Sequence, residues 1–474
     1  MKSSLFLLAS ATTSAFAALP AIGPDYQRPS VESPAAYRDA ELGTWKVAGA
    51  PELSLAPNWW TAFGDPALDA LVERALEHNQ DLRAAAARVE QARASAGLAR
   101  AAFFPSLQVE ADASRFRNLD QAYTTNDYVN VPATLSYELD LWGRVRRLNA
   151  GARAEAAAEA NLFAAARLAL VADVAQTYFA LRATEREEEI VRATAATRQD
   201  ARDVIAARLR GGTAAELDLA RAETELATAE AELAATQQSR AALQNGLAVL
   251  VGVPASGFSL NDRATAATLP AVPADLPSTL LERRPDVAAA EQALIAANAR
   301  IGVAKAAFFP AISLTGSAGY ESAEFDDVFR WDKRVWSVGP RLYLPIFQGG
   351  RNRANLARSE AAYEEAVASF RQQVLVAFRE VQDALTAARL LAAQAAAQER
   401  AAASARRAAQ LSRTRYDAGY VAYLEVVDSE RSALAAERAS VRLGAQRLVA
   451  GVTLIKALGG GWHAPASGTA LTQN

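Results

Sequence analysis

Apolar and polar residues alternate along four stretches of the chain, which fall into two pairs. The alternating stretches cover about 106–117, 128–141, 311–321 and 334–346. In the first of them, Leu107 and Val109 alternate with Gln108 and Glu110. Because successive side chains of a β-strand point to opposite faces, we expect strands with one apolar and one mainly polar face, paired as two hairpins. Pro132 interrupts the second stretch and predicts an edge position or a bulge there.

Long stretches without proline follow each predicted hairpin, and their apolar residues recur with a helical period. They run from Gly143 to about Gly211, from Thr213 to about Leu250, from Gly350 to Ala418 and from Val421 to about Leu458. A helix of roughly 65 residues is on the order of 100 Å long at 1.5 Å per residue, far more than the width of an ordinary globular domain. We therefore expect these alanine-rich helices to pair lengthwise as coiled coils. An earlier helix begins after Asp65, a suitable N-cap, and is expected to break near His78–Asn79.

The two halves of the chain repeat one another. The pentapeptide at 101–105 recurs unchanged at 306–310, and Gly97 stands opposite Gly302 at the same separation. This period is far longer than the 20 to 50 residues of repeat arrays, so it indicates two copies of one large unit. We expect the following divisions: a signal peptide at 1–17, an extended N-terminal segment at 18–65, a first repeat at 66–253, a linker at 254–276, a second repeat at 277–458 and a C-terminal tail at 459–474.

The N-terminus has the pattern of an export signal. Lys2 precedes the apolar run at 5–9, and small residues at 15–17 suit cleavage after Ala17. An ordinary N-terminal helix is the alternative. No later segment has about 18 uninterrupted apolar residues, so no transmembrane helix is predicted, and entry into a membrane would require a barrel. The chain has no Cys, which excludes disulfides and thiolate chemistry.

Composition argues against several classes of function. Charged residues make up 22% of the chain and the formal net charge is −3, so a nucleic-acid partner is not expected. The two His, His78 and His463, are far apart, and no phosphate-binding GxxxxGK[ST] loop occurs. The glycines at 459–461 follow a helix and read as its C-terminal stop. We therefore predict no enzyme activity, no metal site and no cofactor.

Each alternating stretch has about the ten residues that cross a bilayer when a strand is tilted. Four strands cannot close a barrel, because membrane barrels begin at about eight strands, so several chains would have to share one. A soluble antiparallel sheet with one face on a core is the alternative.

The chain resembles the outer-membrane efflux protein family, the TolC-like and OprM-like exit ducts of tripartite pumps. The resemblance covers essentially the whole mature chain. It rests on the opening at 23–29 (GPDYQRP), the two Phe-Phe-Pro junctions, Leu141-Trp142-Gly143-Arg144, the segment 281–286 (LERRPD), and 415–419 (RYDAG) followed by 423–428 (YLEVVD).

The resemblance implies an α+β membrane protein: a trimeric twelve-stranded β-barrel, four strands per chain, continuous with a long periplasmic coiled-coil tunnel. It also implies outer-membrane lipid, a periplasmic adaptor and an inner-membrane pump, commonly of the RND type, as partners. Such family members usually carry a lipidated Cys upstream of the opening, where this chain has Ala18 to Ile22. We therefore expect anchoring by the barrel alone. A duct for type I protein secretion and a periplasmic coiled-coil scaffold without a pore remain alternatives.

The resemblance also assigns site residues. By position, Glu425 and Asp428 match acidic residues that ring a closed periplasmic aperture, Tyr416 matches a tethering tyrosine, and Arg415 is a candidate ion-pair partner. The alternative is that both acids are solvated charges near a helix end. Adaptor contact is expected at the helical tips, at Arg208, Gly212 and Gly419. The two tips differ in sequence and are not expected to be equivalent. Candidate membrane-interface anchors are Phe103, Phe104, Phe308, Phe309, Trp142 and Trp336.

Overall fold

The computed structural model describes residues 21–31, 58–117, 125–260, 267–270 and 283–462. The predicted signal peptide lies outside the described residues, as do parts of the predicted N-terminal segment, linker and C-terminal tail. The chain divides into two compact units. Unit 1 comprises Met1–Val31, Ala87–Asn161 and Ala289–Gln372, and unit 2 comprises Glu32–Ala86, Leu162–Ala288 and Gln373–Asn474.

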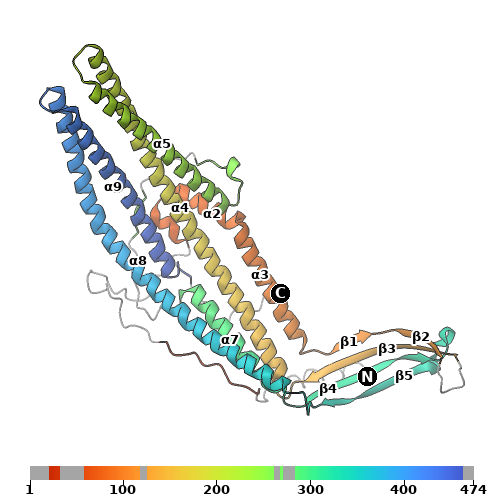
Figure 1. Cartoon of the computed structure of the whole chain (residues 1–474). Coiled ribbons are helices and arrows are strands. Elements are labelled where there is room, and N and C mark those ends of the chain that lie inside the picture. The colour runs from red at the N-terminus through yellow and green to blue at the C-terminus, as the bar shows by residue number, and fades with distance from the viewer. Residues whose placement is uncertain (1–20, 32–57, 118–124, 261–266, 271–282, 463–474) are drawn as a thin grey trace. The chain divides into compact units, whose positions relative to one another are not determined.

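Unit 1 contains one antiparallel sheet built from both repeats (Figure 1). Its strands are β1 (Ser106–Val109), β2 (Asp112–Arg117), β3 (Thr125–Leu139), β4 (Ala311–Ser322) and β5 (Arg334–Tyr343). The order is β1-β3-β4-β5, and β2 pairs with β3 beyond the end of β1. The two hairpins meet where β3 pairs with β4, from Val129 opposite Ser322 to Leu139 opposite Ile312. Among the described residues, the outer edges of β1, β2 and β5 pair with no further strand.

The predicted first strand, 106–117, is two strands, and Pro132 explains why. Ser106 to Val109 and Asp112 to Arg117 pair with β3 in one continuous register, so there is no bulge. Pro132 lies opposite the gap, and Glu110 donates its N–H to the Pro132 carbonyl, but proline has no N–H to return. The expected edge position or bulge at Pro132 is therefore wrong: β3 is an inner strand, and the neighbouring strand is interrupted instead.

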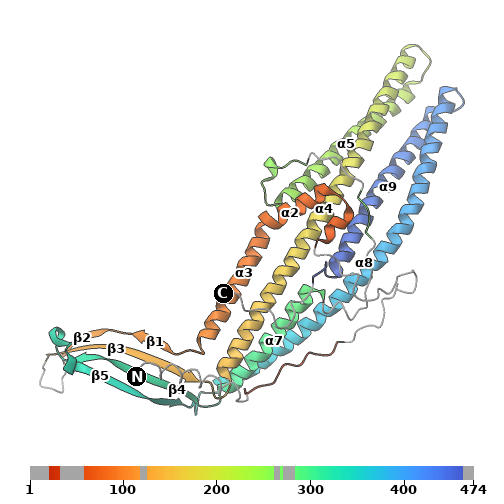
Figure 2. The same ribbon diagram turned by 180° about the vertical axis from the view of Figure 1, so that it is seen from behind.

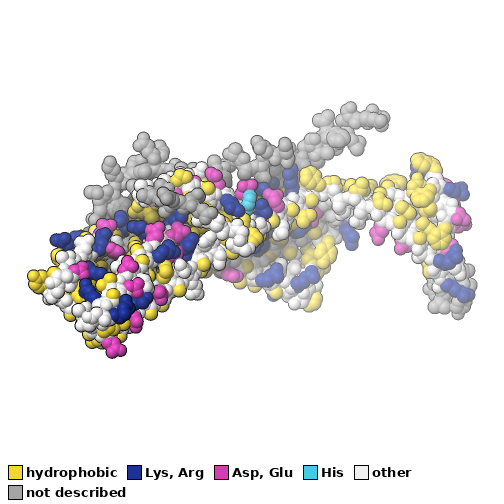
Figure 3. All heavy atoms as spheres, turned by 90° about the horizontal axis from the view of Figure 1, so that it is seen from above, with side chains coloured by type: hydrophobic (Ala, Val, Ile, Leu, Met, Phe, Trp, Pro, Cys, Tyr) yellow, Lys and Arg dark blue, Asp and Glu magenta, His cyan; other side chains and the backbone are white. Residues whose placement is uncertain are grey.

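The register joins the apolar residues of β1, β3, β4 and β5 on one face of the sheet. Leu107 lies opposite Leu135, which lies opposite Gly316, which lies opposite Val338. The polar face has an equivalent row, Gln108, Thr134, Ser317 and Ser337, in which the two serine hydroxyls lie 2.8 Å apart. Much of the apolar face is exposed, including Leu107 and Val338, and Figure 3 shows hydrophobic side chains gathered over the sheet. An apolar surface of this extent requires a partner or a lipid environment.

Helices begin where the strands of unit 1 end. Here the unit includes parts of α3 (Gln80–Ala101), α4 (Arg144–Arg210), α7 (Pro285–Ala306) and α8 (Arg351–Asp417). At the start of α4, the Asp140 carboxylate accepts hydrogen bonds from the backbone N–H groups of Val145 and Arg146 at 3.0 and 2.9 Å. Such a carboxylate satisfies donors that the first turn of a helix leaves free. Two short 3₁₀ turns, η6 (Phe325–Asp327) and η7 (Trp331–Lys333), lie between β4 and β5.

Unit 2 is helical. It contains η2 (Trp59–Phe63), α2 (Pro66–His78), α5 (Glu216–Leu250), η4 (Ala255–Gly257), α9 (Tyr423–Ala457), and the remaining parts of α3, α4, α7 and α8. Asp65 caps α2 by accepting from the N–H of Ala67, and it accepts a second hydrogen bond of 2.6 Å from the Tyr178 hydroxyl. The expected break occurs at Asn79, whose side chain donates to the Leu250 carbonyl and accepts from the N–H of Leu82.

By length and composition, one helix in the described part of the chain, α4, could cross a membrane, although no such segment was expected. Core helices meet the same criterion. Val171, Val174 and Tyr178 of α4 are buried in the hydrophobic core of unit 2, together with Trp60 and Leu68. Burial within the chain covers 39% of the apolar window of this helix.

Candidate functional site

Unit 2 has two helical tips, the α4–α5 turn and the α8–α9 turn (Figure 2), and their backbone geometry is the same. In the α4–α5 turn, the N–H of Gly212 bonds to the Leu209 carbonyl and that of Thr213 to the Arg208 carbonyl. In the α8–α9 turn, Gly419 and Tyr420 make the same two bonds to Tyr416 and Arg415. This is the Schellman arrangement, and Gly212 and Gly419 hold the positive φ angles it requires, 72° and 78°. The tips thus differ in sequence but share one backbone turn.

Side chains connect the two tips. The guanidinium of Arg208 lies over the Tyr416 ring, 5.6 Å from its centroid, and donates a hydrogen bond of 3.3 Å to the Tyr416 hydroxyl. On its other side Tyr416 packs against Tyr423, with ring centroids 5.6 Å apart. Tyr423 is buried in a small cluster with Val426, Val427, Ile205 and Ala222. Arg208 and Tyr416, singled out for separate roles, therefore form one contact between the repeats.

The other residues singled out at the tips lie nearby. Arg415 faces Glu425, with 3.8 Å between guanidinium and carboxylate, and both side chains are about half exposed. Asp428 is exposed one turn further along α9. The pKa of Arg431 is raised mainly by its hydrogen bond with Glu225, and the charge of Asp428 contributes. The predicted Arg415–Glu425 pair is thus close enough to form within one chain.

A buried ion network behind the tips was not found from the sequence. Glu225 of α5 is 4% exposed and pairs with Arg198 of α4, at 3.1 Å, and with Arg431 of α9. Arg198 also donates to the Glu225 carbonyl at 2.9 Å. The sequence does contain a signal for these ion pairs. Glu225 and Arg431 carry opposite charges 206 positions apart, close to the repeat period, and Glu232 and Arg438 have the same separation. Charge complementarity at the repeat spacing would have indicated these contacts.

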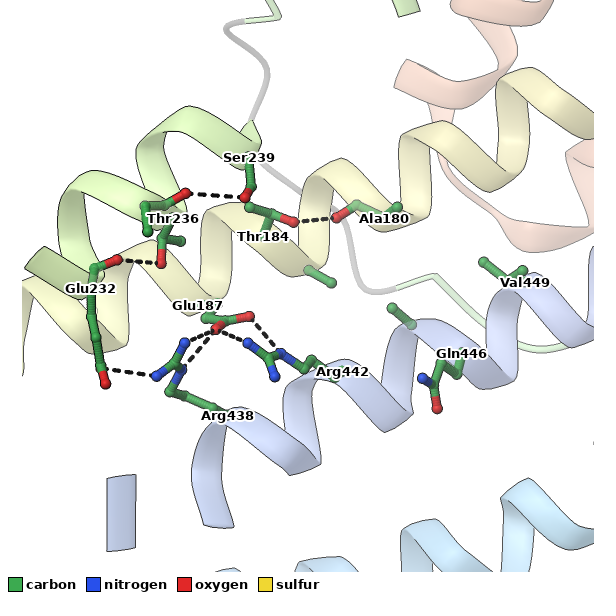
Figure 4. Close-up of a pocket in the computed structure, with 13 residues that line it drawn as sticks. Ala180, Thr184, Glu187, Glu232, Thr236, Ser239, Arg438, Arg442, Gln446 and Val449 are labelled. Carbon is green, nitrogen blue, oxygen red and sulfur yellow. Dashed lines mark hydrogen bonds and ion pairs between the residues drawn. The ribbon is translucent and has the colours of Figure 1, made fainter. Parts of the chain in front are cut away.

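A second network lies beside a groove between α4, α5 and α9 (Figure 4). The Glu187 carboxylate, 9% exposed, accepts from Arg438 at 2.7 and 2.6 Å and from Arg442 at 2.9 and 2.6 Å. Arg438 also pairs with Glu232 at 2.9 Å. The groove has a volume of about 530 Å³, and alanines with the hydroxyls of Thr184, Thr236 and Ser239 also line it. Each of these hydroxyls donates to a carbonyl of its own helix.

Two acids in this part of unit 2, Glu187 of α4 and the half-buried Glu430 of α9, have opposite pKa shifts. Burial by itself raises the pKa of Glu187, but the hydrogen bonds from Arg442 and Arg438 outweigh it and hold the pKa below its ordinary value. For Glu430, burial dominates the attraction of Arg413 and Arg198, so its pKa is raised. Burial also raises the pKa of Tyr423 to about 12. On acidification Glu187 therefore stays charged to a lower pH than an ordinary glutamate, whereas Glu430 takes up its proton at a higher pH than an ordinary glutamate.

The aromatic residues singled out as interface anchors lie at or near the strands of unit 1. Trp142 packs against Phe309 with 4.9 Å between ring centroids, and its Nε1 donates to the Pro310 carbonyl at 2.7 Å. Phe103 is half-buried, and Phe104 and Phe308 are exposed. Trp336 projects from β5 and is 77% exposed. Trp142 thus connects the end of the first hairpin to the start of the second.

In the described part of the chain, no group of three or more His, Cys, Asp or Glu side chains could hold a metal ion. What the described residues provide is a sheet with one apolar and one polar face, and long paired helices whose two turns are connected by the Arg208–Tyr416 contact. These features define a membrane channel subunit with an extended helical part.

Comparisons with known proteins agree with this class. The model of the outer membrane efflux protein family matches residues 71–253 and 276–460. The chain is 36% identical over 451 residues to the solvent efflux pump outer membrane protein SrpC of Pseudomonas putida, covering 93% of this chain and 95% of the relative. It is 34% identical to the cation efflux system protein CusC of Escherichia coli O6:H1, with 93% and 96% covered. The crystal structure of the open state of the Neisseria gonorrhoeae MtrE outer membrane channel superposes with a TM-score of 0.83 at 32% identity, covering 93% and 98%.

The chain therefore belongs to the outer membrane efflux protein family. The predicted family, the TolC-like fold and the outer-membrane location are confirmed. The family is one of transport channels and not of enzymes. The roles assigned to individual gate, tip and anchor residues stay predictions.

Proposed function

We propose that three copies of this chain form an exit duct in the outer membrane, which passively conducts substrates out of a tripartite efflux pump. The observation that carries the proposal is the sheet with two open edges. One chain supplies β1 and β2 at one edge and β5 at the other, with exposed apolar residues on one face. Unpaired edges cannot face lipid, so the sheet must continue into neighbouring chains until it closes. Three chains with four strand positions each give a closed barrel of twelve strands.

The gate belongs at the helical tips. Three copies would bring Glu425 and Asp428 around one axis, where like charges repel one another and favour opening or cation binding. The Arg208–Tyr416 contact opposes this repulsion by connecting the two tips, and the Arg415–Glu425 pair within the α8–α9 turn offsets part of the Glu425 charge. Adaptor contact at Arg208, Gly212 and Gly419 is supported by the repeated turn geometry, which would present the same backbone shape twice per chain.

The partners proposed are a periplasmic adaptor and an inner-membrane pump of the RND type. The relatives' names refer to solvents and to cations. They favour efflux of small molecules or ions over type I protein secretion, with the pump selecting the substrate. The scaffold alternative has no use for the exposed apolar face of the sheet. We propose that the candidate interface anchors contact outer-membrane lipid. These are the aromatic residues Phe103, Phe104, Phe308, Phe309, Trp142 and Trp336.

Planar-bilayer conductance of the purified protein tests the duct. Discrete channels are expected, and extraction from membranes should require detergent. Absence of any channel from folded, detergent-extracted protein would overturn the proposal. A chain that stays in solution without detergent would favour the scaffold alternative.

Cysteine cross-linking tests the shared barrel, because the chain has no Cys of its own. Gln108→Cys on one edge is combined in turn with Ser337→Cys, Gly339→Cys or Arg341→Cys on the other. At least one combination should give covalent dimers and trimers on oxidation. In the control, Thr134→Cys with Ser317→Cys joins two residues that lie opposite one another on β3 and β4, and should give a bond only within one chain. Monomers from every edge combination would contradict the shared barrel.

A further inference from the structure

Residues 21–31, which we call the N-terminal strap, run along unit 1 to the point where the two hairpins meet (Figures 1 and 2). At this point the N–H of Ile22 donates to the Trp142 carbonyl at 2.9 Å. Ala21 lies so close to Gly143, which has a φ of 80°, that a Cβ at Gly143 would be 2.4 Å from the Ala21 Cβ. The strap therefore contacts the first repeat at the residues between the end of β3 and the start of α4.

The strap also contacts the second repeat, along α7. The Asn298 side chain, 4% exposed, donates to the Pro24 carbonyl at 3.0 Å. Further along, Glu291 accepts a hydrogen bond of 3.0 Å from the Tyr26 hydroxyl and pairs with Arg28, also at 3.0 Å. These contacts fix the strap to a helix that leads directly into β4. The strap thus bridges the repeats beside the β3–β4 pairing that joins their hairpins.

Two glycine backbones, those of Gly23 and Gly302, are in contact near the N-terminal end of the strap. Gly23 has a φ of 113°, and a Cβ there would be 2.6 Å from the Gly302 Cα. A Cβ at Gly302 would be 2.9 Å from the Ile22 carbonyl oxygen and 2.8 Å from Cγ of Arg147. Gly97, the residue opposite Gly302 in the first repeat, has no atom within 4 Å of such a Cβ. Of these two equivalent positions, only Gly302, on the helix that contacts the strap, has no room for a side chain.

From this asymmetry we propose that the strap is a latch, whose docking on Gly302 holds the two hairpins in register for assembly in the membrane. The β3–β4 pairing joins strands more than 170 residues apart in sequence, so no short turn sets its register. The strap, together with Trp142 and its hydrogen bond to the Pro310 carbonyl, fixes the ends of both strands at one place. This inference rests on the proposed function for its membrane setting.

Gly302→Val tests the latch, and Gly97→Val is the matched control, since both replace a helical glycine at equivalent positions. Strap docking is measured by the rate at which chymotrypsin cuts after Tyr26, which tracks the undocked population. Assembly is measured separately, as the fraction of oligomer that survives on gels and as conductance. We expect Gly302→Val to speed cleavage about tenfold or more and to reduce oligomer formation, and Gly97→Val to match the unmodified protein. Helix content by circular dichroism identifies a variant that has not folded.

A second variant removes strap contacts without adding bulk. Tyr26→Phe with Asn298→Ala deletes two hydrogen bonds, and should give an intermediate cleavage rate and an intermediate loss of oligomer. The proposed latch is overturned if Gly302→Val leaves the rate of cleavage after Tyr26 unchanged. It is also overturned if cleavage is faster in Gly302→Val and in the Tyr26→Phe, Asn298→Ala double variant while both still form oligomers completely. An unmodified protein that forms oligomers but never conducts would contradict the proposed function instead, and leave the oligomer comparison valid.

Discussion

Replacing Glu187 by Gln should loosen the contact between α9 and the α4–α5 pair. The substitution keeps the shape of the side chain and removes its charge. Two guanidiniums, those of Arg438 and Arg442, now converge on this carboxylate with four N–H groups. With a neutral amide in its place, Glu232 would be the one carboxylate still paired with Arg438.

The size of the effect follows from burial. Removing one partner of a fully buried ion pair costs about 3–5 kcal/mol. Glu187 is 9% exposed, but the Arg442 side chain is 57% exposed and the network borders an open groove, so solvent screens part of this cost. We expect a loss of about 2 kcal/mol in the free energy of unfolding of the helical part, or about 4 °C in melting temperature.

Thermal melting of the helical circular dichroism signal measures this loss, with Glu189→Gln as the control. Glu189 lies two residues away on α4, and its pair with Arg186 is exposed, with side-chain exposures of 60% and 66%. The control should change stability by less than about 0.5 kcal/mol. A double-mutant cycle with Arg442→Gln then isolates the interaction itself, which should be a large part of the total.

The pH dependence supplies the refuting result. An acid whose pKa is lowered in the folded state stabilises it above the ordinary value, here 4.5, and the stabilisation is lost as pH falls through the folded value. The difference between the unmodified protein and Glu187→Gln should therefore stay constant from pH 7 to about pH 5 and shrink below that. A difference that disappears by pH 6, or equal losses in Glu187→Gln and Glu189→Gln, would refute the reasoning.

Three further predictions concern the gate, the ion preference of the pore and the assembly of the barrel. Asp428→Ala should lower the open fraction of single channels in planar bilayers, because it removes part of the charge repulsion at the tips that favours opening; unchanged gating would remove Asp428 from the gate. Asp112→Asn with Glu321→Gln should lower the preference for cations, measured as reversal potential in a salt gradient, because both acids flank Asn130 on the polar face; an unchanged potential would place this row outside the pore. Gly319→Ala should block oligomer formation, because its Cβ would be 2.2 Å from the Val131 carbonyl oxygen, whereas Gly339→Ala, with open space around it, should assemble normally.

The sequence predicts the strands well, since alternation alone separates the two faces and the observed register preserves them. It does not predict that β3 pairs with β4, because no local signal joins Leu139 to Ile312 across the long helices between them. The prediction of an edge position or a bulge at Pro132 is wrong for the same reason. The effect of the N–H that proline lacks depends on which strand lies opposite, and the sequence does not show that strand. Local periodicity predicts which residues share a face of a strand or helix, but it does not predict which other elements pack against that face.

The candidate site divides in the same way. Arg415 and Glu425 lie on either side of one turn, so their proximity could be read from spacing. Glu187 and Arg442 are 255 positions apart, and nothing near either residue indicates the other. The contact between Gly23 and Gly302 also could not be predicted from the sequence pattern. A glycine can indicate that space is limited at its position, but the sequence does not show which residue lies against it.

The two open edges of the sheet also have a genetic consequence. They are different surfaces, one formed by β1 and β2 and the other by β5. In the proposed trimer, subunits would therefore join head to tail, and the ring would close only if every member offered both edges. A chain altered only along β5 would still pair with a normal chain through its other edge and would end the ring early. Alleles of this kind would be dominant in a cell that also carries the normal gene, whereas alleles that unfold the whole chain would be recessive.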